Sequence, residues 1–276
     1  MLEIESTVEG HYSTGGLLDR VQQAVEAGGL DWDALTAADL GPIDHFHIRG
    51  RDATLEMISL AQFKPEMTVL DVGCGLGGPT RALAAEVGCQ VHGVDLTDEF
   101  VETATALTER TGLSDRATFE CCSVLDLPHE SASFDGVLMQ HLNMNIAEKP
   151  RLFSELARVL RPGGTLAMHE ILADRADQPY FPVPWASAPE GSFMCQESAF
   201  REHLADAGFK IGEFRDVTQE SADWFGAVLA KTAESGPPKM GLHVLLGPRF
   251  GEMAKNTFKS LSENRVKVVM AVCKKG

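Results

Sequence analysis

Residues 68 to 78 read Thr-Val-Leu-Asp-Val-Gly-Cys-Gly-Leu-Gly-Gly, and this stretch decides the fold. Val69, Leu70 and Val72 form a nearly continuous apolar run, which is typical of a strand buried on both faces of a parallel sheet. The glycines that begin at Gly73 permit a tight turn and a close approach of the backbone to a ligand. The stretch therefore predicts a strand, a glycine turn and a helix that together form a nucleotide pocket.

Outward from this stretch, strand-like and helix-like patterns alternate along the chain, which indicates a mostly parallel sheet with helical crossovers. We expect an α/β, Rossmann-like fold with seven strands and with helices on both faces, in the intervals between the strands. A helix near residues 148–160 is expected to stop at Arg161-Pro162-Gly163-Gly164, directly before the fifth strand. The strands are expected near residues 67–72, 90–95, 117–121, 134–140, 165–171, 210–217 and 266–272.

Three segments fall outside this alternation and are expected to form a helical cap over the substrate. Residues 1–64 are expected to form an N-terminal helical lid, with an amphipathic helix near Leu17. The sheet domain would then occupy residues 65–276, with cap insertions near 174–194 and 218–264. Apolar side chains of these segments either line a pocket or pack in the core, and the sequence leaves both readings open. They are Tyr180, Phe181, Pro182, Pro184, Trp185, Trp224, Phe225, Met240, His243, Phe250 and Met253.

The chain of 276 residues carries a formal net charge of −16. An acidic surface repels phosphate backbones and anionic lipid, so we expect neither nucleic acid nor a membrane as a partner. The N-terminal residues lack a signal pattern, and no apolar run approaches the length of a membrane span. We therefore expect a cytoplasmic protein, whose oligomeric state the sequence does not indicate.

Six cysteines lie at positions 74, 89, 121, 122, 195 and 273, without a repeated Cys-x-x-Cys spacing. This distribution favours small buried thiols over a disulfide framework or a zinc site. We expect no bound metal.

The glycine turn alone leaves the cofactor ambiguous. Gly73, Gly75 and Gly78 satisfy the G-x-G-x-x-G pattern of dinucleotide enzymes. Asp95 follows about 20 residues later, where a carboxylate can accept hydrogen bonds from both ribose hydroxyls of an adenosine. A nicotinamide-dependent oxidoreductase therefore stays open as an alternative.

Three further features resemble the class I S-adenosylmethionine-dependent methyltransferases of the small-molecule type. Asp71 stands two residues before the first glycine, where the family has an acidic residue. Residues 125–137 contain Leu-Asp-Leu-Pro and Ser-Phe-Asp-Gly-Val, which look like the family's link between strands three and four. Residues 158–164, Arg-Val-Leu-Arg-Pro-Gly-Gly, are similar to its turn before strand five. The resemblance is strong over residues 50–172 and implies S-adenosylmethionine as the cofactor.

The resemblance also implies where that cofactor binds. Asp71 would reach the methionine amino group, and Asp95 would hold the ribose. An alternative is structural: Asp71 would brace the glycine turn, and Asp95 would cap the helix that starts near Thr97. Where many family members place an acidic residue near adenine, this chain has Ser123. The cofactor-binding residues expected are Asp71, Gly73, Gly75, Asp95, Leu96, Ser123, Val124 and Gln140.

The expected reaction is methyl transfer to an oxygen, nitrogen or carbon atom of a small-molecule metabolite. Alignment of the reactants and exclusion of water matter most for such a displacement, and a histidine can serve as general base. His141 and His169, near the ends of the fourth and fifth strands, are the candidate catalytic residues, and Glu170 is a candidate to orient one of them. His47 and Arg49 of the lid are candidates to contact a carboxylate. A protein that binds the cofactor without catalysis is the remaining alternative.

Overall fold

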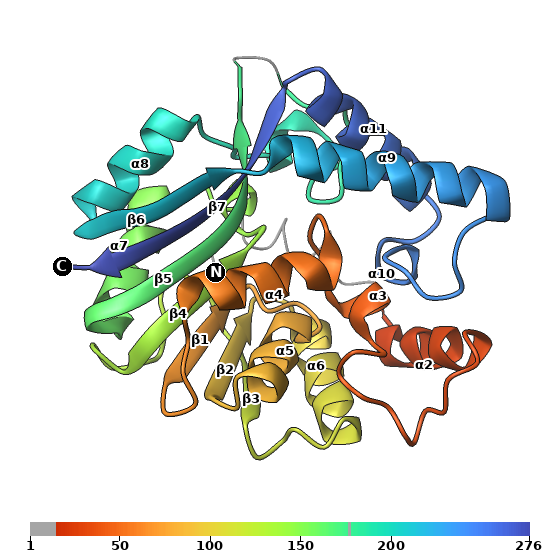
Figure 1. Cartoon of the computed structure of the whole chain (residues 1–276), viewed down its shortest axis with the longest axis horizontal. Coiled ribbons are helices and arrows are strands. Elements are labelled where there is room, and N and C mark those ends of the chain that lie inside the picture. The colour runs from red at the N-terminus through yellow and green to blue at the C-terminus, as the bar shows by residue number, and fades with distance from the viewer. Residues whose placement is uncertain (1–14, 176–177) are drawn as a thin grey trace.

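A seven-stranded sheet forms the centre of the protein, with the strand order β3-β2-β1-β4-β5-β7-β6 (Figure 1). The computed structural model describes residues 15–175 and 178–276. Neighbouring strands are parallel except at β7, which is antiparallel to both β5 and β6. The order reverses between β1 and β4, and such a point leaves a crevice at the carboxyl ends of the strands. The strands are β1 (Thr68–Val72), β2 (Gln90–Asp95), β3 (Ala117–Cys121), β4 (Phe134–Gln140), β5 (Leu160–Ala173), β6 (Phe209–Asp216) and β7 (Val266–Lys275).

Helices cover both faces of this sheet, which confirms the predicted fold class. On one face, α4 (Gly50–Ala61) and α5 (Gly78–Glu86) share an apolar cluster with strand residues such as Val69, and α6 (Asp98–Arg110) lies beside α5. On the other face lie α7 (Lys149–Val159) and α8 (Glu197–Asp206). They pack against strand residues such as Leu70, which follows Val69 in β1 and points to the opposite face of the sheet. Burial on both faces explains the apolar run that the sequence shows in β1.

Two expectations about the sheet were wrong. Strand β5 begins at Leu160 rather than near 165, because Leu160 still pairs with Phe134 before the register shifts. Residues 161–164 therefore form an irregularity within the strand instead of a separating turn. In addition, residues 122–133, between β3 and β4, are described throughout and form a loop, although a helix was expected in every interval. The segment is short and Pro128 interrupts it, so a helix has little room there.

The remaining helices lie over the carboxyl ends of the strands. Helices α9 (Thr218–Ser235) and α11 (Phe250–Ser262) run side by side, and the short α10 (His243–Leu246) contacts α2 (Leu17–Ala27) (Figure 1). Leu17 and Val21 of α2 are buried, as the amphipathic pattern predicts. Two 3-10 helices, η1 (Asn143–Asn145) and η2 (Pro189–Gly191), complete the described elements. Among the helices in the described ranges, none combines the length and apolar character needed to cross a membrane.

A buried ion pair fastens the N-terminal segment to the glycine turn. Arg81 of α5 places its Nη2 2.7 Å from Oδ2 of Asp44, which ends α3 (Gly41–Asp44). Both side chains are at most 1% exposed. At Gly78 a Cβ atom would lie 2.3 Å from the carbonyl oxygen of Asp44, so this contact requires glycine. The segment that the sequence assigns to a lid thus lies directly on the start of α5.

Candidate active site

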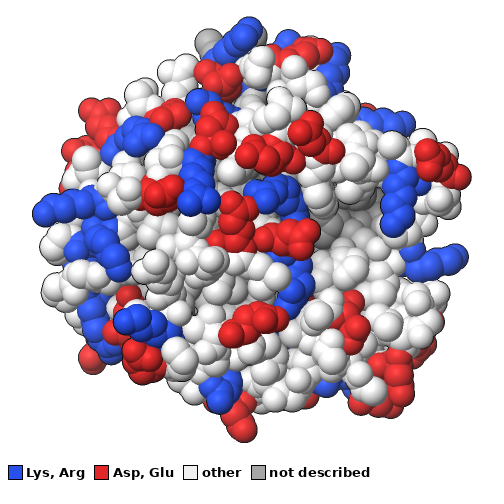
Figure 2. All heavy atoms as spheres, in the orientation of Figure 1, with Lys and Arg blue, Asp and Glu red and all other residues white. Residues whose placement is uncertain are grey.

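A large cavity occupies the crevice at the carboxyl ends of β1, β2 and β4. Its volume is about 1460 Å³, whereas pockets for one small ligand usually measure roughly 300–1,000 Å³. Its roof comes from α9, α11 and the chain that connects them. Figure 2 shows a hollow bordered by uncharged residues between the positions of α9 and α3. The cavity therefore has room for a nucleotide cofactor and a second, bulky molecule.

The exit of β1 supplies the first part of the nucleotide end. Asp71 lines the cavity and accepts a 2.6 Å hydrogen bond from the Thr80 hydroxyl. Burial raises the pKa of Asp71 to about 7. Gly73 and Gly75 follow in left-handed conformations and also line the cavity. A Cβ on Gly75 would meet no atom of the described residues within 4 Å, so the backbone here faces open space that a ligand can fill.

Asp95, at the end of β2, lies across the same crevice. Its two carboxylate oxygens accept the backbone N–H of Gly75 at 2.9 Å and of Thr97 at 3.0 Å. The N-cap of α6 is Thr97 rather than Asp95, which corrects the capping role that the sequence left as an alternative. Asp95 instead ties the glycine turn to the start of α6, and these bonds hold its carboxylate at the cavity wall. Carboxylate oxygens have about four lone-pair sites between them, so these two bonds leave capacity for ligand hydroxyls.

The other residues expected to bind the cofactor also line the cavity. They are Leu96 after β2, Ser123 and Val124 after β3, and Gln140 at the end of β4. Gln140 is 7% exposed, and its amide nitrogen is unpaired within the described residues. A buried donor without a partner is costly, so this nitrogen is a candidate to bind a ligand acceptor.

His141 follows β4 and faces the cavity. It adopts a left-handed backbone conformation with a φ of 54°, which is unusual outside glycine and concentrates at functional sites. Its Nε2 is buried and has no hydrogen-bond partner in the described chain. Burial, and to a lesser degree His47, hold the pKa of His141 well below the usual value of 6.5. The imidazole is therefore unprotonated at neutral pH, as a general base requires.

His169 and Glu170 lie behind His141, outside the cavity lining. The rings of His141 and His169 have centroids 4.7 Å apart, and both His169 nitrogens lack a partner among the residues described. Glu170 does not orient either imidazole: it accepts the backbone N–H groups of Leu142 and Asn143 at 3.2 and 3.0 Å. Burial raises the pKa of Glu170 to about 8, although these two bonds lower it. Glu170 thus braces the chain that follows His141.

Sequence reasoning missed Thr54, which connects the N-terminal segment to the active site. Its hydroxyl donates to Gln140 Oε1 at 3.0 Å and lies 3.0 Å from ring nitrogens of His45 and His47. His47 lines the cavity, as expected for a lid residue, whereas Arg49 forms an ion pair with Glu56 at 2.7 Å instead. A lone threonine inside a helix carries no sequence signal, so this network is visible only in three dimensions.

The far end of the cavity is predominantly apolar. Seven of the cap residues singled out in the sequence line the cavity: Pro184, Trp185, Trp224, Phe225, Met240, His243 and Phe250. Tyr180 lies elsewhere, between Lys259 and Arg265, and Met253 is a buried core residue. Phe181 and Pro182 are outside the cavity lining as well. The cap therefore divides into residues that form the pocket and residues that hold the cap in place.

Comparison with known proteins places this site in a family. A protein-family model described as "Methyltransferase domain" matches residues 70–168. Methyltransferase GfsG of Streptomyces halstedii is 32% identical over 221 residues, which cover 78% of this chain and 74% of that protein. The 24-methylenesterol C-methyltransferase 2 of Oryza sativa subsp. japonica is 37% identical over 123 residues, covering 44% of this chain and 34% of the rice protein.

One solved structure illustrates the likeness of the fold. It is the geranyl diphosphate C-methyltransferase from Streptomyces coelicolor A3(2), in complex with Mg²⁺, geranyl diphosphate and S-adenosyl-L-homocysteine. It matches with a TM-score of 0.72 and 16% identity, covering 100% of this chain and 99% of that chain.

The sheet and its crevice define a Rossmann-like nucleotide-binding protein. The extent of the match to GfsG then shows that the chain belongs to the class I S-adenosylmethionine-dependent methyltransferases. Its cofactor is S-adenosylmethionine, and enzymes of this family transfer methyl groups to small molecules. The alternative of a nicotinamide-dependent oxidoreductase is not retained.

Proposed function

We propose that this protein methylates a hydroxyl oxygen of a bulky, largely apolar small molecule, with His141 as the general base. The observation that carries the proposal is the unpaired Nε2 of His141, which is buried at the cavity where Asp71 and Asp95 are also exposed to a ligand. A neutral imidazole at this place can accept the acceptor's proton as its oxygen becomes a nucleophile.

The residues of the nucleotide end fit the cofactor in charge and shape. Asp71 is proposed to face the methionine amino group, Asp95 the ribose, and Ser123 with Val124 the adenine. Gln140 would present its free amide nitrogen to the amino-acid part. When bound, S-adenosylmethionine supplies a methyl group on a positively charged sulfur, which is a good electrophile without further activation.

The cap supports an apolar acceptor. Trp224, Phe225 and Phe250 of the roof helices line the cavity. The charged side chains that residues 218–264 contribute to the lining are Lys231, Lys239 and Lys255. Aromatic and aliphatic walls favour apolar ligands, and nearby lysines disfavour a cationic amine. Closure of this roof and of residues 15–64, which we propose act as a lid, would exclude water from the reaction. Residues 1–14, which the sequence also assigns to the lid, lie outside the described residues.

The test is incubation of the purified protein with methyl-labelled S-adenosylmethionine and a panel of lipophilic alcohols, phenols, amines and alkenes. Mass spectrometry should locate the label on oxygen. Label on carbon or nitrogen would contradict the choice of acceptor atom. Cofactor binding without any labelled product, across the panel and a metabolite extract, would favour the non-catalytic alternative.

The role of His141 has its own test. The His141→Gln variant should lose about 10² to 10⁴-fold in kcat, with cofactor affinity unchanged. In the wild type, the low pKa of His141 predicts that kcat does not fall as the pH drops to 6.5 and declines only below it. His203→Gln, in α8 and outside the cavity lining, is the matched control and should leave kcat unchanged. Equal activity of the two variants would remove His141 from the mechanism.

We also propose a cytoplasmic location. All six cysteines are free, which suits a reducing compartment. Cell fractionation of the native organism, followed by immunodetection, tests this location.

A further inference from the structure

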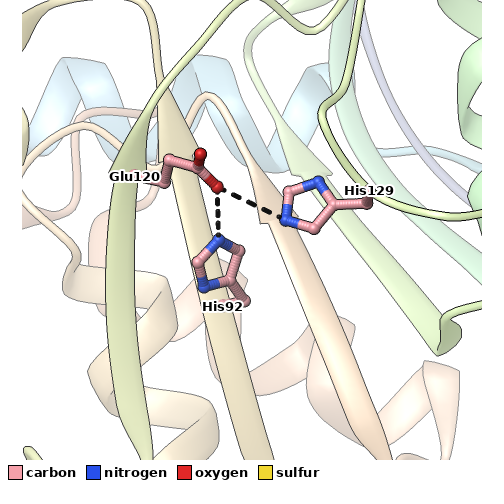
Figure 3. Close-up of side chains that lie close together, drawn as sticks. All are labelled: His92, Glu120 and His129. Carbon is pink, nitrogen blue, oxygen red and sulfur yellow. Dashed lines mark hydrogen bonds and ion pairs between the residues drawn. The ribbon is translucent and has the colours of Figure 1, made fainter.

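A second cluster of ionisable side chains lies away from the cavity, at the β3 edge of the sheet. It consists of His92 on β2, Glu120 on β3 and His129 in the loop 122–133 (Figure 3). The side chains of the three residues are 22%, 44% and 16% exposed, so the cluster is open to solvent on one side. None of them lines the active-site cavity.

The distances within the cluster are long for hydrogen bonds, and they match the spacing of metal ligands. Oε2 of Glu120 lies 3.4 Å from Nε2 of His92 and 3.6 Å from Nε2 of His129. Nitrogen-to-oxygen hydrogen bonds usually measure 2.7–3.2 Å. Ligand atoms around a tetrahedral zinc ion, each about 2.0–2.2 Å from the metal, stand about 3.3 Å apart. One ligand atom from each residue lies within 4.8 Å of the others.

The surrounding structure holds two of these side chains in place. Nδ1 of His92 is 2.8 Å from the Thr118 hydroxyl, which fixes the ring with its Nε2 toward Glu120. Such an outer partner is typical of metal-binding histidines. The His129 ring packs against Phe134 with centroids 5.2 Å apart, and Arg158 donates a 2.6 Å hydrogen bond to the His129 carbonyl. The His129 loop is therefore tied down before any ligand arrives.

We propose that His92, Glu120 and His129 bind one divalent transition-metal ion of the zinc type, with water completing the coordination. Two imidazoles and a carboxylate suit Zn²⁺, whereas Mg²⁺ and Ca²⁺ prefer oxygen ligands. The ion would clamp the loop 122–133 to β2 and β3, in an interval of the sheet that has no crossover helix. Because the ligands are spaced irregularly along the chain, the sequence predicts no such site.

The test uses tag-free protein treated with a chelator and then titrated with Zn²⁺ in the absence of cofactor. Calorimetry or competition with a chromogenic chelator should give one ion per chain, with a dissociation constant at micromolar level or below. The variants His92→Ala, His129→Ala and Glu120→Gln should each weaken binding at least tenfold. His203→Ala, which removes a histidine outside the cluster, is the control and should bind like the wild type.

Two further measurements guard against a false result. Zinc should raise the Tm of the wild type but not of His129→Ala, whose folding is checked by circular dichroism and by cofactor binding. X-ray absorption at the zinc edge should show nitrogen and oxygen ligands. Absence of binding at micromolar zinc, unchanged affinity in the His92 and His129 variants, or sulfur ligation by the free cysteines would overturn the proposal.

Discussion

At the scale of single residues, the proposed contact between Asp71 and the methionine amino group predicts that cofactor binding depends on pH. Its free carboxyl has a pKa of about 7 because it is buried. A cationic amino group beside it favours the ionised form, so binding must release a proton when the pH is below 7. We expect full S-adenosylmethionine affinity above pH 7 and a loss of up to about tenfold for each pH unit below it.

Calorimetry between about pH 5.5 and 8.5 measures this dependence. Asp71→Asn should bind weakly at every pH and lose the slope, whereas Asp98→Asn, on the exposed start of α6, should keep it. A pH-independent affinity in the wild type would contradict the role of Asp71. The stability of the apo-protein depends on pH in the opposite direction. Because the pKa of Asp71 is raised by folding, the folded protein holds an extra proton between about pH 4 and 7. The contribution of Asp71 to the free energy of unfolding therefore falls as the pH rises through this range.

The grouping of the proposed binding residues in one cavity could be predicted from sequence because a motif fixes their spacing. Asp71, Gly75 and Asp95 follow from the strand, turn and strand pattern, and the cavity includes all three. The position of His141 at the end of the fourth strand could also be predicted from the sequence. Thr54 and the cluster of His92, Glu120 and His129 were not, because side chains on different elements meet only through the tertiary fold.

At the scale of elements, the pair of Arg81 and Asp44 fixes α3 on α5. Replacing Arg81 by Leu leaves a buried carboxylate without its partner, and we expect a loss of about 3–5 kcal/mol in unfolding free energy. The control is Arg110→Leu, which breaks a solvent-exposed pair with Asp33 and should cost less than about 1 kcal/mol. Chemical denaturation measures both. Equal losses would show that burial of this pair does not matter.

Strand positions were predicted accurately where apolar residues alternate with polar ones or form a continuous run. The limits of β2, β3 and β4 coincide with those expected. Two segments were predicted wrongly. At residues 161–164 the prediction followed the local preference for a turn, and at residues 122–133 it assumed that a helix follows every strand. Pairing of Leu160 with Phe134 is a long-range contact, and it overrides the local preference of the Arg-Pro-Gly-Gly sequence for a turn. The division at residue 64 stays a prediction.

At the scale of the whole molecule, we propose a separation within the cavity, with the cofactor at the strand exits and the acceptor under the roof of α9 and α11. Trp224→Ala in α9 should raise the KM for the acceptor about tenfold or more by removing aromatic contact area, while the cofactor dissociation constant stays the same. Phe214→Ala on β6, outside the cavity lining, is the matched control and should change neither constant. Steady-state kinetics with calorimetry checks both constants, and parallel changes in them would contradict the separation.

The overall charge bears on partners as well. Figure 2 shows acidic and basic side chains interspersed on one face, although the formal net charge is −16. Such a surface gives no extended basic region for a phosphate backbone on that face. This is consistent with the small-molecule activity of the family.

The roof over the apolar end is drawn largely from one contiguous piece of chain, residues 218–264, which enters after β6 and returns into β7. The residues proposed to bind the methyl donor lie earlier in the chain, between Asp71 and His141. Related proteins can therefore change their acceptor substrate through substitutions in this one segment. The part of the sequence proposed to bind the cofactor need not change.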